Sequence, residues 1–216
     1  MLDGANIGTP NASEMKASVK SSEEQPKQTL GEQWVKAKQN FSMTDGLLYA
    51  LVYVFVLTFI CYPGLTTDDT IDYLTSLKSY DSWHILVTQA VFNAFDTIGR
   101  YSGGVSCLML SNRSIKICSA LRTVFLVTFL LVAFDVAPTV VFSADWFIMI
   151  NLALFSITNG YISTLCAVKA PSTVEGENIG QVGSFIGITV STGIVIGSIL
   201  AFGMTQVIKH SPEYDA

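Results

Sequence analysis

The stretch VFNAFDTIGRYSGG, residues 91–104, places Asn93, Asp96 and Arg100 in a run whose other residues are mostly apolar. A charged side chain in such a run is costly unless it faces a cavity or a partner. The composition indicates which apolar environment surrounds it. Of the 216 residues, 50% are hydrophobic and 13% are charged, and the mean hydropathy is +0.47. These values are typical of a membrane protein.

Five apolar runs are long enough to cross about 30 Å of hydrocarbon as helices. They lie at residues 47–66, 84–109, 115–136, 146–168 and 182–207. The sequence therefore predicts an all-α membrane protein with five transmembrane helices in a domain at 46–208. Residues 1–45 are expected to form a polar cytoplasmic tail or linker, and residues 209–216 a short extracellular tail.

The distribution of basic residues predicts the orientation, because Lys and Arg are retained on the cytoplasmic side of membranes. With the N-terminus inside, only Lys78 and Lys209 fall on the outer side. The cytoplasmic segments then hold Lys16, Lys20, Lys27, Lys36, Lys38, Arg113, Lys116 and Lys169, with Arg100 and Arg122 near the inner helix ends. We therefore expect a multi-pass protein, in the plasma membrane, with a cytoplasmic N-terminus and an extracellular C-terminus.

The sequence shows no familiar catalytic or metal-binding pattern. It has no Gly-rich nucleotide loop and no nucleophile motif, and its net charge of −5 argues against a nucleic-acid surface. We expect neither an enzyme nor a protein that uses a metal or cofactor. The cysteines form no C-x-x-C pair and are expected to be small buried apolar residues. They are Cys61, Cys107, Cys118 and Cys166.

One polar stripe is expected on the second span. Its members are Gln89, Asn93, Asp96 and Arg100, which step by four, three and four residues and so share a helix face. Asp96 and Arg100 are also i, i+4 neighbours that can form an ion pair. Two interpretations stay open: the stripe faces a ligand, or Arg100 extends to the cytoplasmic surface with Asp96 as its counter-ion.

Two further spans carry residues suited to helix packing. Asn159, in the fourth span, is expected to bond to a neighbouring helix more than to a ligand. The last span has the glycine pairs Gly183/Gly187 and Gly193/Gly197, which allow close approach of helix backbones. Helix packing is the expected role of these glycines; the alternative is sliding or rocking of the helices during transport.

The quoted stretch resembles a known signature. FNAFDTIGR is similar to the F-N-x-x-D-x-x-G-R pattern in the eighth transmembrane helix of equilibrative nucleoside transporters. Three other stretches resemble that family in the same order. They are TFICYPGLTT at 58–67, SITNGYISTLCAVKAP at 156–171 and the Gly-rich run at 179–200. One departure is Val127, which stands where the family often has a proline and so removes an expected kink.

The resemblance implies a fold and a missing partner. Equilibrative nucleoside transporters have eleven spans, arranged as six plus five in a fold related to the major facilitator superfamily, with the substrate between the two halves. This chain resembles helices seven to eleven, one half of that bundle. The N-terminal six-helix half is then an expected partner, in cis or in trans.

The resemblance also implies a function: facilitated diffusion of nucleosides or nucleobases with alternating access. Arg100 would donate to ribose hydroxyls or the base, and Asp96 would accept from a hydroxyl while fixing the guanidinium. Asn93 would line the same cavity, and Gln89 lies on the same stripe. The alternative is a truncated or regulatory five-span membrane protein without transport activity of its own.

Overall fold

The computed structural model describes residues 31, 35, 38–39, 42–66, 83–133, 144–175 and 178–209. The described helices belong to one compact unit, Lys38–Ala216. The expected tail at 1–45 lies mostly outside the described residues, as does the expected C-terminal tail at 209–216. Within the described ranges the chain forms helices and no strand, which confirms the all-α prediction.

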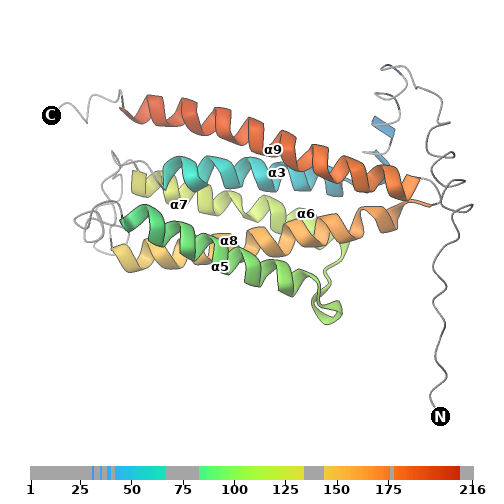
Figure 1. Cartoon of the computed structure of the whole chain (residues 1–216), viewed down its shortest axis with the longest axis horizontal. Coiled ribbons are helices and arrows are strands. Elements are labelled where there is room, and N and C mark those ends of the chain that lie inside the picture. Colours follow the sequence, from blue (N-terminus) through green and yellow to red (C-terminus); the bar gives the residue numbers. More distant parts are fainter. Residues whose placement is uncertain are drawn as a thin grey trace, which may run out of the picture. The chain divides into compact units, whose positions relative to one another are not determined.

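Five long helical segments make up this unit (Figure 1). In chain order they are α3 (Leu47–Phe59) with its π-helical continuation η1 (Ile60–Leu65), α5 (Trp83–Gly103), the pair α6 (Asn112–Leu121) and α7 (Thr123–Ala133), α8 (Asp145–Lys169) and α9 (Asn178–Lys209). Two short 3₁₀ turns, η2 (Ser106–Leu108) and η3 (Pro171–Thr173), follow α5 and α8. The hydroxyl of Ser111 accepts a hydrogen bond from the Ser114 amide and so caps the start of α6.

Four of these segments are long and apolar enough to cross a membrane. They are Leu47–Leu65, Asn112–Ala133, Asp145–Thr173 and Ile179–Val207. The helix α5 has 21 residues, enough for about 30 Å at 1.5 Å per residue, but its polar stripe makes it less apolar. It ends at Gly103, before the expected end of the second span at 109. This helix therefore presents one polar face inside an apolar bundle.

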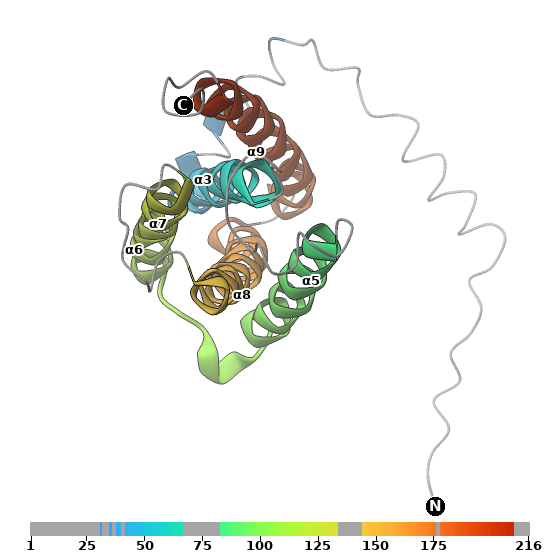
Figure 2. The ribbon, with the colours of Figure 1, turned by 90° about the vertical axis from the view of Figure 1, so that its left-hand side faces the viewer.

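The helices are layered around α8 and α3. Seen along the bundle, α8 lies between α5 and the α6–α7 pair, and α3 lies between α8 and α9 (Figure 2). Two apolar clusters fill the interior. One includes Leu51, Ile115 and Leu165, and the other includes Leu65, Phe129 and Leu152. Polar side chains near the middle of four helices lie between these clusters.

The closest helix contact joins α5 to α8. A Cβ atom at Gly99 would lie 2.1 Å from the backbone oxygen of Ile157, and one at Gly160 would lie 2.0 Å from that of Asp96. A Cβ at Gly103 would meet Thr164 at 2.9 Å. Since real Cβ atoms do not approach so closely, only glycine permits this crossing. Gly99 and Gly103 form a further small-x-x-x-small pair, beyond the two expected in the last span.

The two glycine pairs of α9 differ in their surroundings. Gly193 and Gly197 lie against α3, where Cβ atoms would meet the backbone oxygens of Val52 and Val56 at 2.9 and 2.8 Å. At Gly183 and Gly187 a Cβ would meet nothing within 4 Å. The packing expectation thus holds within this unit for the second pair and not for the first. Gly187 instead lines a shallow groove on α9, together with Ser184 and Ser191.

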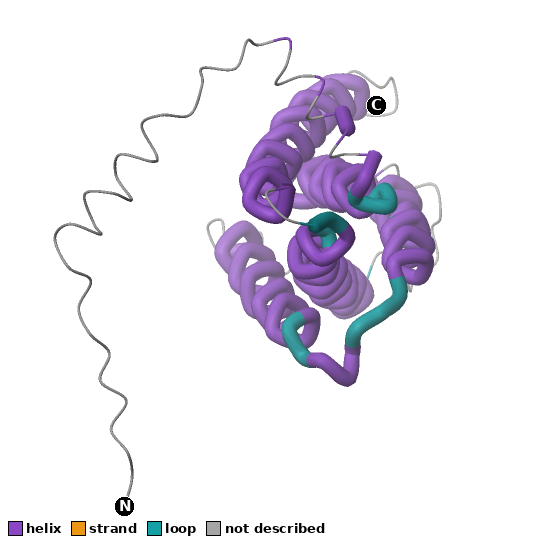
Figure 3. Tube along the Cα trace, turned by 90° about the vertical axis from the view of Figure 1, so that its right-hand side faces the viewer, coloured by secondary structure: helices purple, strands orange, loops and turns teal. Residues whose placement is uncertain are grey.

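One end of the unit is held by basic side chains. Lys116 forms an ion pair with Asp45 at 3.0 Å, and Lys169 donates to the Leu110 carbonyl at 2.5 Å. Tyr161 donates to the Leu108 carbonyl, so the α5–α6 connection is fixed beside the end of α8 (Figure 3). The start of α3, the start of α6 and the end of α8 therefore lie at the same end.

The Asp45 contact has a defined pH dependence. The hydrogen bond from Lys116, and then that from Asn112, hold the pKa of the Asp45 carboxyl below its ordinary value. The contact therefore stabilises the fold at neutral pH and loses that effect as the pH falls through the lowered pKa. Because Asp45 is exposed, its share of the stability is small.

We predict that Gly160→Ala destabilises the unit by about 2 kcal/mol or more, since the added methyl must push α5 and α8 apart. Gly183→Ala is the matched control, because the same methyl enters open space. Thermal unfolding in lipid nanodiscs measures both variants. Equal unfolding midpoints for the two would contradict the assigned α5–α8 contact.

Candidate functional site

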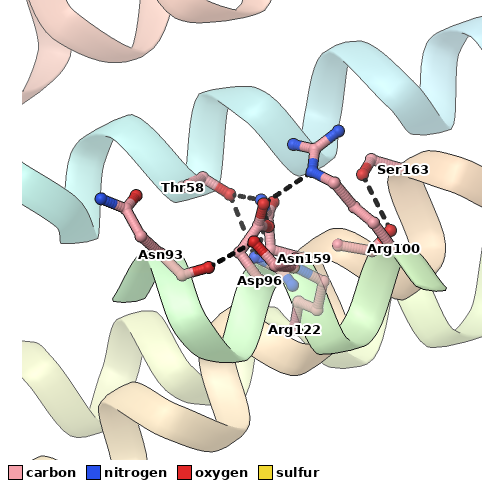
Figure 4. A network of polar contacts seen from close by, with 9 residues as sticks. Thr58, Asn93, Asp96, Arg100, Arg122, Asn159 and Ser163 are labelled. Carbon is pink, nitrogen blue, oxygen red and sulfur yellow. Dashed lines mark hydrogen bonds and ion pairs between the residues drawn. The ribbon is translucent and has the colours of Figure 1, made fainter. Parts of the chain in front are cut away.

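Asp96 is the centre of the polar layer, and its carboxylate is held from two sides. The residue is 8% exposed although it carries a charge. Arg100 Nε donates to its Oδ2 at 2.6 Å, and Asn159 Nδ2 donates to its Oδ1 at 2.7 Å (Figure 4). The first contact confirms the expected i, i+4 ion pair. The second joins α5 to α8 directly beside Gly160.

Arg100 is the most open member of this layer. Its side chain is 50% exposed, whereas the side chain of Asp96 is 12% exposed. The bond to Asp96 draws Nε toward the middle of α5, away from the C-terminal end at Gly103. A side chain extending to the membrane surface would point the other way. The guanidinium is therefore held beside the middle of α5, on the exposed side of the unit.

The remaining members of the stripe lie on the exposed side of α5. The Asn93 side chain is exposed, and it has no hydrogen-bond partner among the described residues. Gln89 accepts a hydrogen bond from the Tyr62 hydroxyl at 2.5 Å. The Tyr62 ring in turn stacks on Phe92, with centroids 4.3 Å apart. Gln89 thus links the end of the first span to α5 through Tyr62, whereas the Asn93 side chain is exposed.

Arg122 is the residue that sequence reasoning misplaced. It was expected near an inner helix end, but it lies in the middle of the Asn112–Ala133 span and is 2% exposed. Its Nη1 donates to the Phe155 carbonyl at 3.0 Å and to Thr158 Oγ1 at 2.8 Å. The guanidinium carbon also lies 4.5 Å from the centre of the Phe155 ring, which adds a cation–π contact.

The other terminal nitrogen of Arg122 completes the layer. Nη2 donates to Thr58 Oγ1 at 3.0 Å and reaches Asn159 Oδ1 at 3.5 Å. Thr58 Oγ1 also lies 2.6 Å from Asn159 Oδ1 and 2.6 Å from the Val54 carbonyl, so its one hydroxyl hydrogen is shared between these two acceptors. The expectation that Asn159 bonds across helices is therefore confirmed, with partners on three other segments. A sequence signal for Arg122 did exist, since a lone arginine within an apolar run meets the same criterion that singled out Arg100.

The helix is interrupted at Arg122 itself. The regular α-helix ends at Leu121 and resumes at Thr123, with the Phe125 amide bonded to the Arg122 carbonyl three residues back. The break therefore lies five residues before Val127, the position where proline was noted as absent. A tightened turn at this point lets a long side chain enter the bundle between α3 and α8.

The described residues offer no group of three or more His, Cys, Asp or Glu side chains that could hold a metal ion. The four cysteines are free, and Cys61 and Cys166 are buried as expected. Cys107 is exposed on η2 and Cys118 is half-buried, so the expectation of burial is wrong for these two. Cys107 differs because α5 has already ended at Gly103.

Comparison with known proteins decides the family. The family model described as "Nucleoside transporter" matches residues 4–206. The chain belongs to the nucleoside transporter family. It is accordingly a multi-pass membrane protein, and the stretch that carries Asp96 and Arg100 lies inside the matched region.

Several relatives resemble this chain over part of their length. It is 26% identical over 206 residues to human equilibrative nucleoside transporter 1, a match that covers 89% of this chain and 42% of the relative. It is 26% identical over 151 residues to equilibrative nucleotide transporter 2 of Arabidopsis thaliana and 27% identical over 157 residues to equilibrative nucleotide transporter 5 of the same plant. These plant matches cover 70% of this chain and 34% of each relative. The chain thus spans about a third of the length of the plant transporters it matches.

Proposed function

We propose that this chain supplies the C-terminal half of a transporter that moves nucleosides or nucleobases down their gradient by alternating access. The observation that carries the proposal is the half-exposed guanidinium of Arg100, held by the buried carboxylate of Asp96. A charged group left open on a membrane-spanning helix is costly when it faces lipid. The open side of α5 therefore faces a cavity between this unit and an N-terminal six-helix half.

The chemistry of this face suits a neutral ligand rich in hydroxyl and amide groups. The Arg100 guanidinium has further N–H donors besides the Nε–H that binds Asp96, and Asn93 adds both a donor and an acceptor. Because Asp96 and Arg100 offset each other's charge, the pair binds a polar ligand without requiring an opposite charge on it. Ribose hydroxyls and the edges of a nucleobase meet this requirement.

The packing supports movement of the five helices as one body. The glycine contacts of α5 with α8 and of α9 with α3 bring backbones together with little room to slide. Relative motion is then easier between this unit and its partner half than within it. Rocking of two such halves around a site near mid-depth is the usual form of alternating access.

We further propose that the basic end of the unit is cytoplasmic, because Arg113, Lys116 and Lys169 gather there. The exposed Cys107 lies on η2, beside this end. We predict that an impermeant maleimide labels Cys107 only after cells are permeabilised, with Cys107→Ser as the control. Labelling of Cys107 in intact cells would reverse the orientation.

The proposed site is tested by uptake of labelled nucleosides, normalised to surface protein, with this chain co-expressed with a six-helix half. Arg100→Lys is predicted to weaken apparent affinity on the order of tenfold, because an ammonium cannot hold Asp96 and a ligand hydroxyl in one planar fork. Asp96→Asn is predicted to weaken it similarly, and it also lowers folded abundance because Arg100, half-exposed on a membrane-spanning helix, loses its counter-ion.

Two controls define the result. The chain alone is expected to give no saturable uptake, since the site needs walls from both halves. Arg113→Lys makes the same substitution at an exposed position on α6 and is expected to leave uptake unchanged. Normal affinity and rate in both Arg100→Lys and Asp96→Asn would show that the pair is structural.

A further inference from the structure

The site proposed above is connected to a second, fully buried arginine on another helix. Arg100 holds one carboxylate oxygen of Asp96, and Asn159 holds the other. The opposite side of the Asn159 amide faces Thr58 and Arg122. The order Arg100, Asp96, Asn159, Arg122 therefore forms one continuous chain of polar contacts across α5, α8 and the α6–α7 junction (Figure 4).

The direction of every bond in this chain follows from the chemistry of its members. A guanidinium only donates, and a carboxylate only accepts. Asp96 Oδ1 accepts from Asn159 Nδ2 at 2.7 Å, so the amide turns its Oδ1 to the other side, where Thr58 Oγ1 lies at 2.6 Å and Arg122 Nη2 at 3.5 Å. The carboxylate on one side and the Thr58 and Arg122 contacts on the other therefore favour the same orientation of the Asn159 amide, which is restrained from both sides.

We propose that Arg122 is a positioning residue for the Asp96–Arg100 pair, acting through Asn159. This inference rests on the proposed function only in that the pair contacts the ligand. Arg122 touches no ligand itself, since its side chain is buried among Thr58, Phe155 and Thr158. Arg122 restrains the Asn159 amide, and that amide restrains the Asp96 carboxylate. The carboxylate in turn orients the Arg100 guanidinium.

When Arg100 turns from Asp96 to a ligand, Asp96 loses the partner of its Oδ2 oxygen. It keeps the hydrogen bond from the Asn159 amide, which Arg122 polarises. The carboxylate therefore keeps one hydrogen bond while the guanidinium moves. This arrangement lets Arg100 exchange one acceptor for another without leaving the buried Asp96 carboxylate without any hydrogen bond.

The test measures the hydrogen-exchange rate of the Arg100 Nε–H, which donates to Asp96. The chain contains three arginines, Arg100, Arg113 and Arg122, so a sample labelled with ¹⁵N-arginine gives three side-chain Nε–H signals. The 216-residue chain is studied in lipid nanodiscs, and hydrogen exchange at Arg100 is compared between variants. Arg122→Gln removes the charge, and Thr58→Val removes the hydroxyl that donates to Asn159 with little change of shape.

Thr128→Val is the matched control. Thr128 is bonded to Asn151 at 3.0 Å, so this change removes another threonine–asparagine contact with α8, and none of its bonds leads to Asp96. Arg122→Gln and Thr58→Val are expected to speed Arg100 exchange by about tenfold, because a less firmly held Asp96 carboxylate weakens its charge-assisted bond to the Arg100 Nε–H. Thr128→Val is expected to leave that exchange unchanged.

Unchanged Arg100 exchange in Thr58→Val, with the Arg113 signal and the helicity preserved, overturns the inference. If Arg122→Gln does not fold, Thr58→Val decides the question alone. The readout requires neither ligand nor transport, so it separates two failures. If Arg100 exchange is faster in Thr58→Val and uptake by Arg100→Lys is normal, the coupling of the Asp96–Arg100 pair to Asn159 stands. The ligand-binding role of the pair is then rejected.

Discussion

The close backbone contact between α5 and α8 is the constraint on which the rest of the structure depends. Gly99 and Gly160 let the helices approach until a single methyl on either would collide with the partner's backbone oxygen. Only at this separation does Asn159, one residue before Gly160, reach the carboxylate of Asp96. Gly99 in FNAFDTIGR and Gly160 in ITNGYIS therefore allow the close helix approach that brings the polar side chains beside them into contact.

That layer lies between two apolar clusters and links four helical segments through hydrogen bonds. Thr58, Asp96, Arg122 and Asn159 come from α3, α5, the α6–α7 junction and α8. A buried guanidinium is tolerable here because its terminal nitrogens have acceptors and an aromatic ring lies beside it. The same contacts leave Arg100 as the member that is open to the outside of the unit.

Much of this could be predicted from the sequence, and the gaps have physical reasons. The helical class and the Asp96–Arg100 pair followed from apolar run lengths and an i, i+4 spacing, which are local properties. The partners of Asn159 and the burial of Arg122 depend on which helices become neighbours, so spacing within one helix could not identify them. Likewise, Gly183/Gly187 and Gly193/Gly197 have the same spacing, but only the second pair faces α3.

The central claim is that the open side of Arg100 contacts the nucleoside. The most direct measurement is a solid-state NMR contact between ¹⁵N-labelled arginine side chains and a ¹³C-ribose nucleoside bound to the assembled two-half transporter. We expect a contact from the Arg100 guanidinium and none from Arg122, whose side chain is buried inside the bundle and whose terminal nitrogens donate there. A bound nucleoside that gives no contact to Arg100 would contradict the claim.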